Sequence, residues 1–398
     1  DHAGAHRRFK AGLRLDRECA PCAEGAGTAA FALGNVADAL PFLERALRLE
    51  PSRAAARSNV AAALGKLAAD VDSRYLPRAV SAMERVLECS PDDPEAACKL
   101  IFLRGQVCDF RGFEELFARV RKHALAHAGQ RLPVLAPFNA LLLPFSLSDL
   151  LSLHRAHAPP TAPVPLHTFA LLSDVGGSSL PQRFRVGFLS ADLRDHPVGR
   201  DLAVAFRALS LSGGVEVYAY AINRIAGEGD GEWEERDLRW AKAMRDNAAS
   251  LVGLQGDTDA AAAARIAADR CHVLVDVMGY TRGNRREILA LRPAPVLLAF
   301  KGYMSTTGAP HLALASDIVS TPPEFLPFYS EKVAYFPSTF FISGHAENHP
   351  DVLDPSSWKP IVFEEQDRIL PRAGNSSRLL LCSFNGLYKT DAPTFALW

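Results

Sequence analysis

The sequence predicts an α plus α/β protein, in which helical repeats precede a parallel sheet covered by helices on both faces. Apolar residues in the first hundred positions recur at spacings of three and four, which indicates amphipathic helices. After about residue 183 the pattern changes to short apolar strands that alternate with helices. Because 398 residues exceed what one compact core usually holds, we expect at least two domains.

Composition excludes several classes of protein. The 44 basic and 45 acidic side chains nearly cancel, which rules out a strongly basic nucleic-acid-binding chain. The apolar runs fall short of the ~20 residues that cross a bilayer, so no membrane-spanning segment is expected. Seven scattered cysteines do not resemble a secreted disulfide framework, which favours a reducing compartment. The chain begins at Asp1 and stops at Trp398 within a pattern, so we expect a fragment.

Residues 1–94 contain an internal repeat. The pattern of residues 39–51 recurs at 79–91, an offset of 40, and the preceding helix recurs at an offset of 34. The difference of about six residues predicts a loop insertion around residues 70–75. A pitch of 34, with small residues at the helix crossing and proline after the second helix, is typical of tetratricopeptide repeats. An alanine-rich helical bundle without repeat identity is the alternative.

A helical transition region is expected over residues 95–158, where the repeat is lost. The proline-rich segment 159–182 cannot form a helix throughout and is expected to be a linker or a strap over the surface, with the domain boundary there. From residue 183 to about 378 the chain is expected to form the α/β domain. Its strands are predicted at residues 184–189, 215–222, 272–276, 296–300 and 317–319.

Three polar loops follow predicted strands of this sheet, at residues 190–199, 277–285 and 301–308. Ligands bind beyond the carboxyl ends of parallel strands, so the three loops are predicted to form one binding rim. His196 begins the helix after the first loop and could hold or deprotonate a hydroxyl group. The alternative is a capping loop in which Asp195 and His196 only satisfy backbone groups. The glycines of the second loop could cradle a phosphate or a peptide backbone, without forming a known nucleotide fingerprint.

Two short motifs are interpreted as structural. Cys19 and Cys22 form a C-x-x-C pair, which could be redox-active or half of a zinc site. No second pair stands at metal-ligand spacing, so two thiols beside a helix are the preferred interpretation. Asp70-Val71-Asp72 has the D-x-D form of some metal-dependent glycosyltransferases, but it falls in the repeat insertion and is expected to be a solvated loop.

Six motifs, read together, resemble in order and spacing those of the protein O-linked N-acetylglucosamine transferases. They are RVGFLSAD with HP (185–192, 196–197), MGYTRG (278–283), LRPAPV (291–296), GY with TTG (302–308), YSEK (329–332) and FNGLYK (384–389). Residues 106–110 look like the end of that family's repeat region, and the resemblance runs from about residue 20 to 398.

The resemblance implies a tetratricopeptide superhelix followed by two Rossmann-like halves in the GT-B arrangement. Such enzymes transfer N-acetylglucosamine from UDP-N-acetylglucosamine to Ser or Thr hydroxyls of intracellular proteins, with inversion and without a metal or cofactor. Protein substrates would enter through the repeat groove, and a cytoplasmic or nuclear location is implied. The second catalytic half would begin near residue 379, so this chain is expected to be inactive by itself.

The motifs also assign residue roles by resemblance. His196 matches the active-site histidine, and Lys389 matches the lysine that grips the donor phosphates, as suits a compact point charge. Tyr388 would line the donor pocket beside Gly386, where the family has glutamine. The acceptor or sugar pocket would be formed by Tyr280, Thr281 and Thr307. Asp276, at a strand end, is a second candidate base, although a carboxylate there is as often structural.

Further departures leave other functions open. Met304-Ser305 replaces the family's usual Pro-Gly, so that loop is expected to differ. Plant-type relatives that use GDP-fucose tend to have His-Thr where this chain has Tyr280-Thr281, which favours N-acetylglucosamine. A non-catalytic repeat scaffold is the alternative from another class, favoured by the lost glutamine and opposed by the presence of His196 and Lys389.

Overall fold

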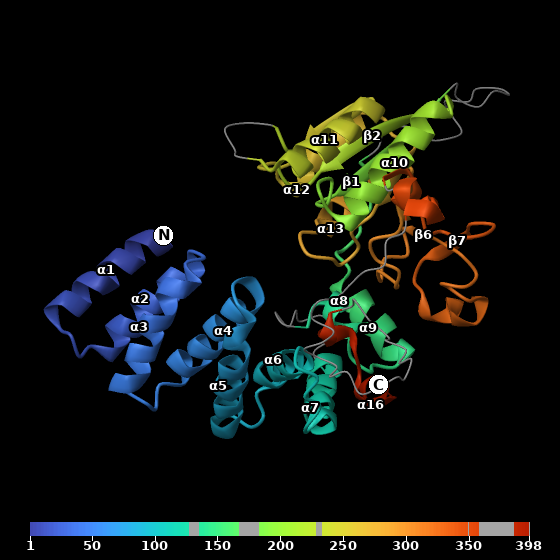
Figure 1. Ribbon diagram of the computed structural model, residues 1–398. Helices are drawn as coiled ribbons and strands as arrows, with labels where there is room; N and C mark the ends of the chain where they lie inside the picture. Colours follow the sequence, from blue (N-terminus) through green and yellow to red (C-terminus); the bar gives the residue numbers. More distant parts are fainter. Residues whose placement is uncertain (127–134, 167–182, 228–232, 349, 358–385, 398) are drawn as a thin grey trace. The chain divides into compact units, whose positions relative to one another are not determined.

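The computed structural model describes residues 1–126, 135–166, 183–227, 233–348, 350–357 and 386–397 (Figure 1). The chain forms two compact units. One comprises Asp1–Phe145 with Leu381–Trp398, and the other comprises Ser146–Leu380.

The first unit is a series of helices, and the first seven pack one on the next in chain order (Figure 1). The helices are α1 (His2–Leu15), α2 (Ala20–Ala32), α3 (Val36–Leu49), α4 (Ala54–Asp70), α5 (Leu76–Cys89), α6 (Pro94–Gly105), α7 (Phe113–Ala126) and α8 (Pro137–Ala140). A Cβ at Gly27 would lie 2.6 Å from Cγ of Leu43, so the small residue lets α2 and α3 approach closely. The pairs α2–α3 and α4–α5 confirm the predicted helical repeat.

The six-residue insertion lies where the sequence predicted it. Residues Ser73–Tyr75 form a single 3-10 turn, η1, between α4 and α5, and Asp72 caps it through the backbone N–H of Arg74. Asp72 also accepts a hydrogen bond from Arg74 Nε, whose guanidinium lowers the pKa of that carboxyl group. In the D-x-D motif, Asp70 thus ends α4 and pairs with Lys66 at 2.6 Å, whereas Asp72 caps the turn.

The prediction of two thiols at Cys19 and Cys22 is wrong, because the structure joins them in a disulfide. Cys19 is the N-cap of α2 and Cys22 lies in its first turn, which brings their Cα atoms within 5.3 Å of each other. That separation is within the range that a disulfide spans.

The second unit is built on seven parallel strands, β1 (Phe184–Ser190), β2 (Val215–Ala221), β3 (Ser250–Gly253), β4 (Val273–Asp276), β5 (Val296–Ala299), β6 (Ala313–Ser316) and β7 (Lys332–Tyr335). Their spatial order is β3-β2-β1-β4-β5-β6-β7, which is the Rossmann-like order with its topological switch between β1 and β4. In register, Leu189 of β1 pairs with Asp276 of β4, so both strands end at the same edge. The predicted parallel α/β fold is therefore confirmed.

Helices cover both faces of this sheet. Phe206 of α10 (Pro197–Leu211) and Met244 of α11 (Glu235–Asn247) pack into one buried cluster. Ile266 of α12 (Asp259–Ala268) and Ile288 of α13 (Arg286–Ala290) pack into the cluster on the opposite face. Short helical turns η2 (Pro323–Phe328), α14 (His345–Asn348), η3 (Pro350–Leu353) and η4 (Pro355–Ser357) complete this unit.

One predicted boundary differs from the structure. The helix α9 (Leu147–His157), expected with the transition region, belongs to the sheet unit because His154 is buried against Tyr303. The prolines of residues 159–166 form the expected strap, in which backbone amides of Ala162 and Leu166 donate to carbonyls at the end of α13. Residues 167–182 of the expected linker lie outside the described part of the chain.

The predicted strand at residues 317–319 is also wrong, because β6 ends at Ser316. The carboxylate of Asp317 accepts hydrogen bonds from the backbone amides of Val319 and Ser320, which turns the chain away from the sheet. These backbone donors, with that of Phe340, hold the pKa of Asp317 at about 2.

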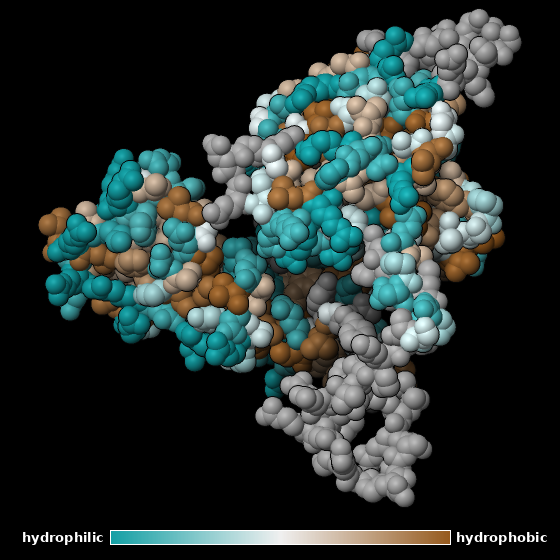
Figure 2. Space-filling view, turned by 45° about the horizontal axis from the view of Figure 1, so that its top comes forward, coloured by the Kyte–Doolittle hydropathy of each residue, from teal (hydrophilic) through white to brown (hydrophobic). Residues whose placement is uncertain are grey.

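The surface reflects the balanced composition. In Figure 2 hydrophilic and hydrophobic residues are intermingled over the visible face of both units. Among the described residues, no helix combines the length and apolar character needed to cross a membrane.

Candidate active site

The three loops predicted to share a rim are in contact. Sδ of Met278, in the loop after β4, lies 3.3 Å from Oγ of Ser190 and 3.3 Å from the backbone nitrogen of Ala191, both at the end of β1. A Cβ at Gly302, in the loop after β5, would lie 1.7 Å from the carbonyl oxygen of Val277. The two contacts join the three loops at the carboxyl edge of the sheet.

His196 lies on this rim, beside the topological switch. It is the N-cap of α10, where its Nδ1 accepts a hydrogen bond from the backbone N–H of Val198 at 3.3 Å. Asp192 Oδ2 lies 3.7 Å from the same nitrogen, and the imidazole is 37% exposed. Capping occupies Nδ1, while Nε2 has no hydrogen-bond partner among the described residues. The two interpretations of His196, as cap and as reactive group, are therefore compatible.

Asp276 holds the loop that follows β4. Its side chain is 3% exposed, and it accepts hydrogen bonds from the backbone amides of Met278 and Gly279 at 2.9 and 3.2 Å. Burial raises the pKa of this carboxyl group, against the opposing charge of Arg286 at 3.7 Å. Because the carboxylate of Asp276 is used to hold the backbone of the loop after β4, the geometry favours the structural interpretation of Asp276 over the catalytic one.

The residues predicted for the acceptor or sugar pocket use their hydroxyls within the protein. Tyr280 donates to the carbonyl of Thr307 at 2.9 Å, and Thr281 Oγ1 donates to the carbonyl of Met278 at 2.8 Å. The Thr307 side chain is fully buried and donates to Glu331. The structure places all three at or behind the rim, where they shape the loops.

Glu331 lies in the YSEK motif and is a buried anchor whose role the residue pattern did not predict. Its carboxylate accepts from the hydroxyls of Thr306 and Thr307 and from the backbone amide of Thr307, the last at 2.6 Å. Thr306 Oγ1 in turn accepts from the backbone amides of Gly308 and Ser330. One carboxylate therefore holds the end of the third loop.

The sequence pattern also did not predict the role of His154 in α9, whose side chain contacts residues of the second and third loops. Its Nδ1 donates to the carbonyl of Leu150 at 2.6 Å, so its Nε2 accepts from the hydroxyl of Tyr303. The rings of His154, Tyr280 and Tyr303 form a cluster with centroids 5.6 to 5.9 Å apart, in which Tyr280 meets the other two rings edge-to-face. The Arg286 guanidinium lies 4.5 Å from the centre of the Tyr280 ring.

Acid should destabilise the sheet unit through His154. Burial lowers the pKa of this fully buried imidazole from 6.5 to about 4. Between these two pH values the imidazole is protonated in the unfolded chain but neutral in the folded chain. Its contribution to stability is present above about pH 6.5 and is lost as the pH falls toward 4, up to roughly 3 kcal/mol. Urea unfolding between pH 7 and 4 should show a steeper fall for the natural chain than for His154→Gln. His345→Gln, an exposed control, should keep the natural slope, and equal slopes for all three would contradict this role.

The residues predicted to bind the donor lie in the helical unit. Gly386 precedes the short 3-10 turn η5 (Leu387–Lys389), which is followed by α16 (Ala392–Leu397). Lys389 is exposed, and of Tyr388 only the backbone is described. Residues 379–385, with the Phe384-Asn385 part of the last motif, lie outside the described part of the chain. Lys389 therefore belongs to the helical unit and His196 to the sheet unit.

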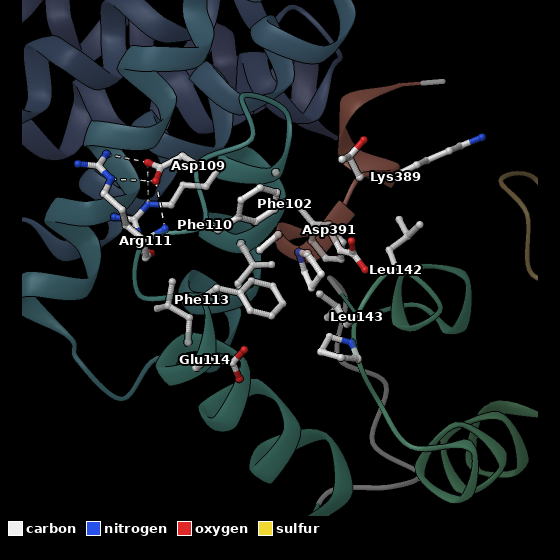
Figure 3. Close-up of a pocket in the computed structure, with 18 of the residues that line it drawn as sticks. Phe102, Asp109, Phe110, Arg111, Phe113, Glu114, Leu142, Leu143, Lys389 and Asp391 are labelled. Carbon is white, nitrogen blue, oxygen red and sulfur yellow. Dashed lines mark hydrogen bonds and ion pairs between the residues drawn. The ribbon is translucent and has the colours of Figure 1, made fainter. Parts of the chain in front are cut away.

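A cavity of about 410 Å³ lies beside this turn in the helical unit (Figure 3). Figure 3 shows the aromatic rings of Phe102 and Phe110 at the cavity, whereas the Lys389 ammonium points away from it. Arg111 is paired with Asp109 at 2.7 Å, and its guanidinium helps to hold the pKa of that carboxyl group at about 2. Apolar walls and a paired arginine do not suit a diphosphate, so this cavity is not assigned to the donor.

In the described part of the chain, no group of three or more His, Cys, Asp or Glu side chains is arranged to hold a metal ion. The structure thus defines a protein that carries helical repeats and a Rossmann-like α/β unit with a histidine at the carboxyl edge of its sheet. Comparison of sequences gives the family: residues 107–367 match the model of glycosyl transferase family 41, and the chain belongs to that family.

Individual relatives carry transferase names. The chain is 28% identical over 301 residues to the probable UDP-N-acetylglucosamine–peptide N-acetylglucosaminyltransferase SEC of Arabidopsis thaliana, covering 73% of this chain and 29% of the relative. It is 30% identical over 278 residues to the corresponding transferase of Caenorhabditis elegans, covering 66% and 23%. The chain thus spans about a quarter of each curated relative.

A solved structure is also similar to the chain. It is that of a mutant O-GlcNAc transferase from Thermobaculum terrenum, with a TM-score of 0.42 and 20% identity over 85% of this chain and 55% of that one.

Proposed function

We propose that this chain contributes repeats and the first catalytic half to an inverting protein N-acetylglucosaminyltransferase. In the reaction, a Ser or Thr oxygen of a protein bonds to the anomeric carbon of UDP-N-acetylglucosamine, and the bond from that carbon to the diphosphate breaks and releases UDP. The hydroxyl proton passes to a base, for which His196 is the first candidate. Family membership and the names of the two curated relatives support this assignment. No metal or cofactor is required in the proposal.

The observation that carries the proposal is the position of His196. Its imidazole is partly exposed on the rim at the topological switch, its Nδ1 is fixed by the start of α10, and its Nε2 is available to a hydroxyl group. A histidine fixed at one nitrogen is a good positioning residue and a candidate base, because its orientation is set before the substrate arrives. We give it more weight than Asp276, whose oxygens already hold backbone amides.

The other residues are proposed to act in two places. Lys389, as a compact cation, would stabilise the charge of the departing diphosphate, with Tyr388 and Gly386 beside the donor. Tyr280, Thr281 and Thr307 would determine the shape of the sugar or acceptor pocket, because their hydroxyls are bonded within the protein. Protein substrates would approach along the helical repeats, and a cytoplasmic or nuclear location is part of the proposal.

Nucleotide binding tests the proposal. Calorimetry would be performed with UDP-N-acetylglucosamine, UDP and GDP-fucose, on this chain and on a longer chain that continues through the second catalytic half. We expect the two UDP ligands to bind selectively to the longer chain, because in this family the second half supplies most of the nucleotide pocket, so this chain alone should be inactive. Selectivity for GDP-fucose would overturn the proposed donor. Absence of nucleotide binding by the folded longer chain would leave a scaffold function in its place.

A further inference from the structure

Cys19 and Cys22 form a reactive arrangement that the proposed function does not use. They flank Ala20 and Pro21, which begin α2, and they are joined as a disulfide at the start of this 13-residue helix. Both are partly exposed, so a reagent in solution can reach the bond. Partly exposed C-x-x-C pairs are the arrangement that disulfide oxidoreductases use.

The surroundings of the two sulfur atoms differ. Sγ of Cys19 accepts a hydrogen bond from the backbone N–H of Cys22 at 3.2 Å, in the N-cap position of the helix. The positive end of the helix dipole favours negative charge on that sulfur when the bond is broken. Cys22 instead faces the buried cluster between α1 and α2, which includes Leu13. A Cβ at Gly12 of α1 would lie 2.9 Å from Sγ of Cys22.

The other described cysteines provide an internal contrast. Cys98 and Cys271 are buried, and burial raises the pKa of their thiols to about 12 and about 11, which makes them unreactive near neutral pH. Cys89 is exposed and Cys108 is partly exposed, and both are free thiols. Cys89 therefore serves as an accessible reference thiol that lies near the end of α5, away from any helix N-terminus.

We propose that Cys19–Cys22 is a thiol–disulfide exchange site that is reduced by dithiols. A thiolate of the dithiol attacks Sγ of Cys19, the S–S bond breaks, and the Cys22 thiolate leaves and takes up a proton. The second thiol of the reductant then loses its proton and attacks the reductant's own sulfur in the mixed disulfide. The Cys19 thiolate is released and takes up a proton. The pair gains two electrons and two protons, and the dithiol becomes a cyclic disulfide.

Alkylation of the complete chain tests this proposal. The protein is reduced with dithiothreitol, freed of reductant without oxygen, and treated with iodoacetamide at pH 7, and the labelling of each cysteine is followed by mass spectrometry. We expect Cys19 to react roughly tenfold faster than Cys89, because the helix start stabilises its thiolate. Oxidised glutathione added to the reduced chain should restore the disulfide. Equal labelling of Cys19 and Cys89, or a pair that stays reduced with oxidised glutathione, would overturn the proposal.

Single variants distinguish the two sulfurs. Cys22→Ser should accumulate a mixed disulfide between Cys19 and glutathione, whereas Cys19→Ser should form several-fold less at Cys22. Serine at position 19 preserves the N-cap, so the helix should remain folded, as circular dichroism can verify. Equal glutathione adducts in two folded variants would contradict the assigned asymmetry. This experiment does not involve nucleotide or acceptor, so its outcome is independent of the transferase proposal.

Discussion

Replacing Gly302 with alanine should prevent the sheet unit from folding normally. The new methyl group would lie 1.7 Å from the carbonyl oxygen of Val277, and that oxygen belongs to backbone, which cannot rotate away as a side chain can. To relieve the overlap, the loop after β5 must separate from the loop after β4. We expect the free energy of unfolding to fall by more than about 4 kcal/mol, a loss that single substitutions cause when they produce a severe steric overlap or break a buried hydrogen-bond network.

Urea unfolding followed by tryptophan fluorescence would measure this loss, with Gly214→Ala as the matched control. Gly214 lies in the same unit, directly before β2, and a Cβ there would meet no atom within 4 Å. The control should unfold within about 0.5 kcal/mol of the natural chain. If Gly302→Ala were as stable as the control, the close contact between the two loops would be refuted.

Lys389→Ala should reduce turnover by about a hundred- to a thousandfold or more in a longer chain that completes the proposed transferase. The departing diphosphate gains negative charge in the transition state, and removing one fixed group that stabilises such charge costs this much in comparable sites. The side chain is exposed in the helical unit, so its truncation should leave folding unchanged. Steady-state kinetics with UDP-N-acetylglucosamine and a protein acceptor would provide kcat and KM.

The matched control for that experiment is Lys332→Ala. Lys332 is an exposed lysine in β7, and its truncation removes the same charge and the same number of atoms. It should retain nearly full activity. A Lys389→Ala enzyme with near-natural kcat would exclude this lysine from the mechanism, while leaving the binding of UDP ligands as a separate question.

Much of the fold could be predicted because periodicity is a local property. The strands β1, β4 and β5 are short apolar runs, and the repeat gave the helix pairs α2–α3 and α4–α5. The strands β3 and β7 were missed because neither has a buried residue, and therefore neither has the apolar pattern of a central strand. The strand predicted at residues 317–319 was placed one segment too late, because strand propensity alone was used to locate it. Ile318 and Val319 favour a strand but are 62% and 81% exposed, whereas the plain sequence Ala-Leu-Ala-Ser enters the sheet.

The candidate site was only partly predictable, for a related reason. His196 was found because it follows a strand directly, and the connection rules of parallel sheets place such loops on one edge. No local pattern predicts the contacts of His154 and Glu331, although Glu331 lies in the YSEK motif, because they act on loops 149 and 22 to 25 residues away. Only the folded chain reveals that the third loop rests on a histidine from α9 and a carboxylate from the start of β7.

The attachment of α9 to the sheet unit determines where the chain can be divided. The proline-rich segment marks the apparent border in the sequence, yet a piece that started after those prolines would lack His154. The hydroxyl of Tyr303 would lose its acceptor, and Gly308, which packs against the His154 backbone, would be uncovered. Anyone who expresses the α/β half alone should therefore begin before Ser146, where the natural seam between the two compact units lies. The proline-rich segment thus lies inside the sheet unit and not at its border, because α9, the first helix of that unit, precedes it.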